Sequence, residues 1–118
     1  MGITTVKLTI RNPENPSEGL ENVFLVDSGA IYSVVPESDL KELGIIPHRT
    51  MDFSLADGTI IKRDIGDAIF EMNNTRAASP VVFGQEGDSR LLGAFSLEAL
   101  GFVLDPFKRE RLFFAAGP

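Results

Sequence analysis

The sequence has 118 residues, 43% of them hydrophobic and 24% charged, which fits one globular domain over residues 1–118 with a single hydrophobic core. The net charge of −6, without any basic run, argues against nucleic acid as a partner. Because the chain has no Cys and one His, His48, disulfides, thiolate metal sites and a cysteine nucleophile are excluded, and a zinc site would need carboxylate ligands. No apolar run approaches the roughly 20 residues that cross a membrane, and the first ten residues lack a signal-peptide pattern. We therefore expect a soluble, cytoplasmic protein with no membrane partner.

The first third of the chain predicts strands joined by turns. Residues 6–11 alternate apolar and polar side chains, which is the period of a half-buried strand. Residues 12–19 contain Pro, Asn and Glu pairs and predict a turn. Residues 23–26 form a short apolar strand, and residues 36–43 predict a short helix with Gly44 as its C-terminal stop.

The remainder predicts a β-rich continuation. Asp57-Gly58 is a strong hairpin signal. Ser96 is expected to cap a helix over residues 97–100 that stops at Gly101. Aromatic residues of the C-terminal extension, 105–118, are expected to pack into the core. Further strands are predicted at residues 51–56, 59–63, 64–71, 80–83, 102–104 and 111–114. The fold class is therefore mostly β with one or two short helices.

One short motif carries recognisable chemistry. The apolar run Phe24-Leu25-Val26 is followed by Asp27-Ser28-Gly29-Ala30. Taken alone, these residues are those of an ordinary polar turn at the end of a strand. Because Asp27 follows an apolar strand, we expect its carboxylate to stand in a partly dry site, where charge is poorly screened and a water can be activated. Gly29 permits a tight loop and the close approach of a peptide backbone.

The surrounding order of motifs gives this loop a context. Leu91-Leu92-Gly93-Ala94 lies downstream and leads into the short predicted helix, and the Asp57-Gly58 hairpin lies between the two motifs. This order resembles the retropepsin-like (clan AA) aspartic proteases over residues 4–105, and most closely their small bacterial and archaeal members. The resemblance implies a closed β-barrel of the acid protease fold, formed by a single-lobe subunit of a homodimer.

The resemblance also implies roles for particular residues. The Ser28 hydroxyl would reach across the subunit interface, and Leu92 with Gly93 would form a hydrophobic brace behind the Asp27 loop. A flap at about residues 53–66 would close over an extended peptide or protein substrate and bond to its backbone. Retroviral members carry charged residues that pair across the dimer at positions where this chain has Ile31, Tyr32 and Ala94. The dimer contacts are therefore expected to differ.

Peptide hydrolysis by this route needs two carboxylates that share one proton, one accepting a proton from water and the other donating to the carbonyl oxygen. Because the chain contains one such motif, a twofold homodimer that pairs two copies of Asp27 is expected. We predict an aspartic endopeptidase with the catalytic residues Asp27, Ser28 and Gly29, and with no cofactor or metal. The predicted substrate-binding residues are Ala30, Ile31, Leu55, Ala56, Asp57, Gly58, Leu91 and Leu92, with Ile60 as a further wall residue.

Two other functions stay open at this point. A catalytically silent dimer of the same fold could serve as a peptide-binding or assembly module, since fold does not fix function. A metal-dependent hydrolase could combine Asp27 with Asp57, Asp64 or Asp67, although aspartates scattered on hairpins are far more often turn and surface residues.

Overall fold

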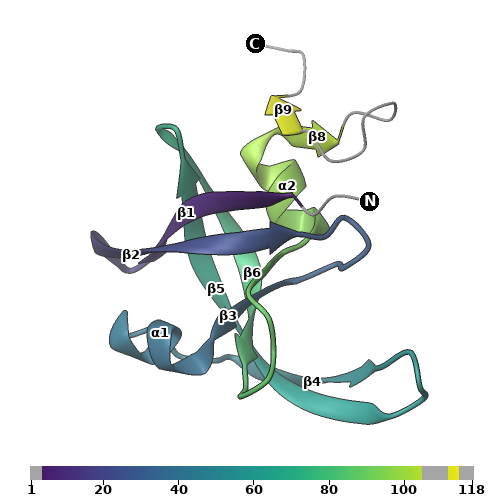
Figure 1. The fold of residues 1–118 in the computed structure, drawn as a ribbon. Coiled ribbons are helices and arrows are strands. Elements are labelled where there is room, and N and C mark those ends of the chain that lie inside the picture. The colour runs from purple at the N-terminus through teal and green to yellow at the C-terminus, as the bar shows by residue number, and fades with distance from the viewer. Residues whose placement is uncertain (1–3, 105–111, 115–118) are drawn as a thin grey trace.

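The computed structural model describes residues 4–104 and 112–114. Strands dominate this part of the chain, and the two helices are short (Figure 1). The elements in chain order are β1 (Thr5–Asn12), β2 (Asn15–Val26), β3 (Ser33–Pro36), α1 (Glu37–Glu42), β4 (Arg49–Ser54), β5 (Ile60–Met72), β6 (Thr75–Gly84), β7 (Leu91–Leu92), α2 (Ala94–Leu100), β8 (Phe102–Leu104) and β9 (Leu112–Phe114).

The main sheet closes on itself. Its seven strands follow the order β1-β2-β7-β3-β6-β5-β4, and β1 also pairs with β5, so six strands form a ring and β4 stands outside it. The first part of β5 pairs only with β4, and from Ile65 onward β5 pairs with β6. The β4–β5 hairpin therefore extends away from the ring (Figure 1). β8 and β9 form a separate two-stranded sheet.

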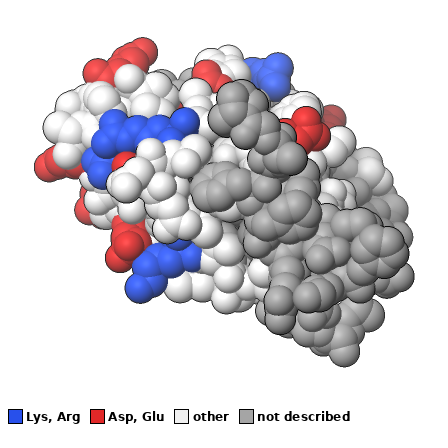
Figure 2. Space-filling view, turned by 90° about the horizontal axis from the view of Figure 1, so that it is seen from above, with Lys and Arg blue, Asp and Glu red and all other residues white. Residues whose placement is uncertain are grey.

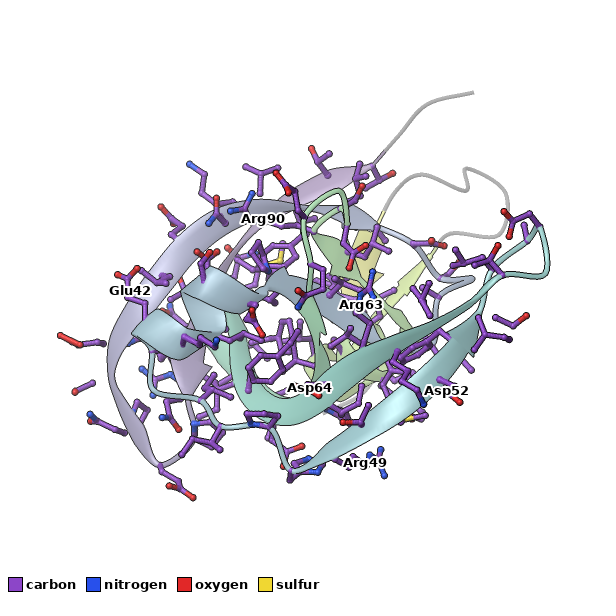
Figure 3. All side chains as sticks on the ribbon, turned by 90° about the horizontal axis from the view of Figure 1, so that it is seen from below. Glu42, Arg49, Asp52, Arg63, Asp64 and Arg90 are labelled. Atoms are coloured by element: carbon purple, nitrogen blue, oxygen red, sulfur yellow. The ribbon has the colours of Figure 1, made fainter. Side chains whose placement is uncertain are left out.

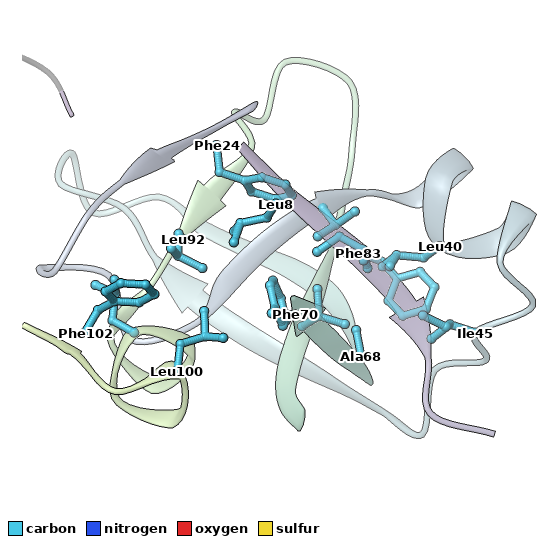
Figure 4. Close-up of a cluster of buried hydrophobic side chains, with 14 residues drawn as sticks. Leu8, Phe24, Leu40, Ile45, Ala68, Phe70, Phe83, Leu92, Leu100 and Phe102 are labelled. Atoms are coloured by element: carbon cyan, nitrogen blue, oxygen red, sulfur yellow. The ribbon is translucent and has the colours of Figure 1, made fainter. Parts of the chain in front are cut away.

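The core fills the interior of the ring and the space beneath the helices. Phe24 of β2 packs edge-to-face on Phe70 of β5, with 6.5 Å between the ring centroids. Alternate residues of β1 point inward as the period of two predicts, and Leu8 and Ile10 are both buried. The buried apolar cluster comprises Leu8, Ile10, Phe24, Val35, Leu40, Ile45, Ala68, Phe70, Val81, Phe83, Leu92, Leu97, Leu100 and Phe102 (Figure 4).

Several turns adopt the geometry that their residues favour. Asn73 and Asn74 have φ angles of 51° and 68° and form a tight hairpin turn between β5 and β6, consistent with the tolerance of Asn for the left-handed region. Gly44 and Gly101 follow the two helices with positive φ, which confirms both as helix stops. Gly58 also has a positive φ, 88°, at the tip of the β4–β5 hairpin.

Two predictions of secondary structure were wrong. Residues 12–19 are not a continuous turn, because β2 begins at Asn15 and its first residues pair with β1 up to Asn12. These residues of β2 are largely exposed, so no hydrophobic alternation marks them as a strand. Ser96 does not cap α2, because the helix begins earlier with Gly93 at its N-cap, and Ser96 is fully buried within it. The predicted strand at residues 80–83 is the end of the longer β6, which starts at Thr75.

The exposed surface is mixed in charge. On the face shown in Figure 2, basic side chains lie among acidic ones. No helix in residues 4–104 is long and apolar enough to cross a membrane. The predicted core packing of the C-terminal extension concerns side chains outside the described residues.

Candidate active site

The loop that carries Asp27 begins where β2 ends. β2 runs parallel to β7, with Val26 opposite Leu92, and the Asp27 amide continues the ladder by donating to the Leu92 carbonyl at 3.0 Å. The carboxylate of Asp27 accepts a hydrogen bond from the Gly29 amide at 3.0 Å, and the Asp27 carbonyl accepts one from the Ala30 amide at 3.1 Å. This local turn fixes the carboxylate relative to its own backbone.

The catalytic triplet predicted from the sequence lies at the surface of the single chain. Asp27, Ser28 and Gly29 are all exposed. The expectation of a partly dry carboxylate is therefore not met in the chain on its own. Apolar side chains nearby are exposed as well: Ile31 at 58% in the same loop and Phe95 at 45% in α2.

Residues 92–95 brace the loop from behind. Leu92 is fully buried, and the backbone of Gly93 packs against the loop so tightly that a Cβ at this position would lie 2.5 Å from the Tyr32 carbonyl oxygen. The first amides of α2 add two hydrogen bonds, from Ala94 to the Ala30 carbonyl at 2.8 Å and from Phe95 to the Ile31 carbonyl at 3.1 Å. The structure thus places Leu92 and Gly93 in the bracing position that the resemblance implied.

A cavity of about 720 Å³ opens between this loop and the β4–β5 hairpin. Of the predicted binding residues, Ala30, Ile31, Leu55 and Leu91 line it, as does Gly29 of the predicted catalytic triplet. The other lining residues are Tyr32, Val34, Met51, Asp52, Phe53, Ser54, Ile61, Arg63, Val82, Gly87, Asp88 and Ser89. The walls are therefore largely apolar with a few polar groups, as is typical of ligand sites.

The remaining predicted residues lie around this cavity and not in its wall. Ala56, Asp57 and Gly58 form the tip of the hairpin, and Leu92 lies behind the loop. Ile60 is 59% exposed and does not line the cavity, whereas its neighbour Ile61 does. The difference of one position follows from the alternation of side chains along a strand.

The hairpin tip is a compact turn held by its own hydrogen bonds. The Gly58 amide donates to the Leu55 carbonyl at 2.9 Å, and the Leu55 amide donates to the Thr59 carbonyl at 2.8 Å. The carboxylate of Asp57 accepts a hydrogen bond from the Thr59 amide at 2.9 Å. Hydrogen bonds from the side chain and the backbone of Thr59 lower the pKa of Asp57. Asp57 therefore stabilises the turn as a carboxylate.

Two contacts tie the hairpin to the rest of the chain beside the cavity. The ring of Phe53 in β4 meets Tyr32 of the Asp27 loop edge-to-face at 6.0 Å between centroids. Arg63 of β5 forms a bidentate ion pair with Asp88, with N···O distances of 2.8 and 3.2 Å. Arg63 lies among the elements at the centre of Figure 3, unlike Arg49 at the outline of the molecule. The hydrogen bonds from Arg63 lower the pKa of Asp88, and the same hydrogen bonds raise the pKa of Arg63.

The aspartates of the metal-hydrolase alternative are engaged with separate partners. Asp57 holds its own turn, Asp64 accepts a hydrogen bond from Thr50 at 2.9 Å, and Asp67 lies 3.4 Å from His48. Within residues 4–104 and 112–114, no three His, Cys, Asp or Glu side chains gather in a way that could hold a metal ion. The donor set that this alternative needs is not assembled here.

Sequence reasoning missed several residues at this site. Tyr32, Arg63 and Asp88 line the cavity, and three serines, at positions 33, 79 and 96, form a buried polar group behind the loop. A weak signal existed for two of the serines, at positions 33 and 79, because each directly precedes a short run of mainly apolar residues. Their partners lie far away along the chain, so no local pattern could reveal the contacts.

Comparison with known proteins gives a result at the level of fold. No protein-family model matches the chain, and no curated protein matches its sequence. The fold is that of the retroviral, retropepsin-like proteases. Among solved structures, the solution structure of the simian foamy virus (mac) protease aligns with a TM-score of 0.52 and 20% sequence identity, and the alignment covers 79% of this chain and 92% of that one. At this identity the likeness establishes a shared fold.

Proposed function

We propose that the chain is one subunit of an aspartic endopeptidase whose active site pairs Asp27 from two copies. The observation that carries this proposal is the position of Asp27 on a rigidly braced loop, with its carboxylate exposed and its neighbours Gly29 and Ala30 in the wall of the cavity under the hairpin. The shared fold with a viral protease supports the same conclusion.

Pairing would supply what one subunit lacks. Two carboxylates brought close together cannot both ionise, so one would hold the proton that it later donates to the scissile carbonyl, and the other would activate water. The exposed Ile31 of the loop and Phe95 of α2 would be covered by a second copy, which would also dry the site. The β4–β5 hairpin would lie over an extended peptide, whose side chains would enter the largely apolar cavity.

The test compares wild type with Asp27→Asn and with a matched control, Asp67→Asn. Asp67 is also exposed but lines a different and smaller cavity, so the control removes the same charge away from the site. Each protein is incubated with a pool of unfolded peptides from pH 4 to 7.5, and cleavage is read by mass spectrometry. We expect cuts by wild type and Asp67→Asn that Asp27→Asn does not make.

Sedimentation of the same samples tests the dimer. A protein that is monomeric at micromolar concentration and still cuts peptides through Asp27 would contradict the two-subunit site. A folded dimer that makes no Asp27-dependent cut would contradict the endopeptidase and favour the peptide-binding or assembly module.

A further inference from the structure

Three serine side chains form a continuous hydrogen-bonded chain behind the Asp27 loop. Ser33 begins β3, Ser79 lies in β6 and Ser96 lies in α2, and their exposed fractions are 0%, 4% and 0%. The Oγ atoms of Ser33 and Ser96 are 2.6 Å apart, and those of Ser96 and Ser79 are 2.8 Å apart. Backbone groups close both ends: the Gly93 amide donates to Ser33 Oγ at 2.9 Å, and Ser79 Oγ donates to the Pro80 carbonyl at 3.2 Å.

The two ends determine the direction of every hydrogen bond in between. The Gly93 amide can only donate and the Pro80 carbonyl can only accept. If Ser79 donates to Pro80, then Ser96 donates to Ser79 and Ser33 donates to Ser96. Each hydroxyl then gives one hydrogen bond and receives one. The reverse order would leave the buried hydrogen of Ser33 without an acceptor along the chain, which costs free energy in a dry interior. A chain with one polarity is also mutually strengthened by polarisation.

The hydrogen bonds between the three serines connect the start of β3 and α2 to β6, a central strand of the ring. Ser33 directly follows the Asp27 loop, and Ser96 lies in the first turns of α2, next to the amides that hold Ala30 and Ile31. Ser79 belongs to β6, which is paired on both sides by β3 and β5. The link therefore runs from the Gly93 brace and the start of β3, through α2, to β6 at the centre of the paired strands.

An apolar interior would not need hydroxyls at these positions. Val34 and Val35 follow Ser33, Pro80, Val81 and Val82 follow Ser79, and Leu97 follows Ser96. Apolar packing alone tolerates small shifts, whereas a chain of hydrogen bonds between 2.6 and 3.2 Å specifies one relative position of the segments.

We infer that Ser33, Ser79 and Ser96 are positioning residues that hold residues 93–95 against the Asp27 loop and so fix where the Asp27 carboxylate stands. Their effect on a reaction rate depends on the proposed function, but their effect on the loop does not. A shift of about 1 Å in a catalytic group can reduce turnover by up to about 100-fold. Even a smaller displacement of the Asp27 loop should therefore lower kcat measurably.

The first test measures amide hydrogen exchange in the folded protein for Ser96→Ala, which removes the middle link. Ser38→Ala is the matched control, because Ser38 is exposed in α1. In Ser96→Ala we expect the amides of Asp27, Ala94 and Phe95 to exchange about tenfold faster than in wild type, while those of the β1–β2 hairpin change less than about twofold. Ser38→Ala should match wild type throughout. Exchange that stays within twofold at all three amides, or that rises equally in β1 and β2, would overturn the inference.

The second test is kinetic and uses a peptide that the wild type cuts. Ser96→Ala should lower kcat by about tenfold and leave KM within about twofold, because most of the cavity wall, including the β4–β5 hairpin, lies outside the loop that the variant loosens. A rise in KM with unchanged kcat would overturn a positioning role. If the wild type cuts no peptide, the proposed function fails, and the exchange experiment alone decides the inference. If Ser96→Ala does not fold, Ser79→Ala removes only the last link of the chain and takes its place in both tests.

Discussion

Replacing Gly93 by Ala should destabilise the protein through a steric conflict with backbone. The new Cβ would lie 2.5 Å from the Tyr32 carbonyl oxygen, 2.6 Å from the Tyr32 carbonyl carbon and 3.0 Å from the Ala30 carbonyl oxygen, whereas ordinary contacts begin at 3.4 Å. Relief would require the loop and β7 to separate by almost 1 Å. A flexible side chain could move aside, but these neighbours are main-chain atoms. The Ala30 carbonyl is hydrogen-bonded to the Ala94 amide, and the Tyr32 carbonyl follows Ile31, whose carbonyl is hydrogen-bonded to the Phe95 amide. We expect a loss of about 3 kcal/mol, the upper end of the usual range for overpacking.

The assay is urea denaturation at pH 7, with Gly87→Ala as the control. Gly87 has a φ of +92°, and no atom lies within 4 Å of the position that an added methyl group would take, so its replacement introduces backbone strain of about 1–2 kcal/mol without a clash. Gly93 has a φ of −94°, so its replacement introduces the clash without that strain. The midpoint urea concentration for Gly93→Ala should fall further than that for Gly87→Ala. In thermal denaturation, the Tm of Gly93→Ala should decrease by about 10 °C relative to wild type. A change below about 0.5 kcal/mol for Gly93→Ala would refute the claim that this glycine holds the loop in place.

Three further outcomes follow from the site. Asp88→Asn should cost about 1 kcal/mol at pH 7, because it breaks the bidentate pair with Arg63. That pair lowers the pKa of Asp88, so its contribution to stability is present above the unfolded carboxyl value near 4 and disappears as the pH falls through the lower folded value. The free energies of unfolding of wild type and variant should therefore converge as the pH falls below about 4. Ala30→Ser adds a hydroxyl next to the Asp27 turn that could donate to the ionised carboxylate, and it should shift the acidic limb of the pH–rate profile downward; an unmoved or raised limb would contradict this. Phe53→Ala removes the edge-to-face contact between the hairpin and the loop tyrosine, and it should raise KM several-fold with little change in kcat, as steady-state kinetics would show.

Elements with a strong local signal could be predicted from the sequence. The alternation around Leu8 and Ile10 identified β1, and Asp57-Gly58 identified the hairpin, because side-chain period and turn chemistry act over a few residues. The beginning of β2 was missed because its residues are exposed and owe their extended shape to backbone pairing with β1. The early start of α2 was missed because its N-cap, Gly93, is held by a distant residue. The Gly93 amide donates a hydrogen bond to Ser33, which lies 60 positions away in the sequence.

The candidate site divides in the same way. Asp27, Gly29 and the Leu92-Gly93 brace could be found from short motifs, and the structure places them on one loop and its support. The ion pair between Arg63 and Asp88 could not be predicted from the sequence, because the two residues are 25 positions apart and neither belongs to a motif. Which side of the hairpin lines the cavity also needed the structure, because the strand register decides between Ile60 and Ile61.

The closed order of the strands has a consequence for how the chain folds. β1 completes the ring by pairing Thr9 with Glu71, and β2 meets β7 by pairing Leu25 with Leu91, so both closures join segments that are far apart in sequence. The entropy of closing such loops must be overcome before the contacts form, which places folding on the order of milliseconds to seconds rather than microseconds. Until β7 arrives, the edge of β2 that ends at Asp27 is open to other strands. Early intermediates should therefore associate through this edge, and dilution during refolding should increase the yield of native protein.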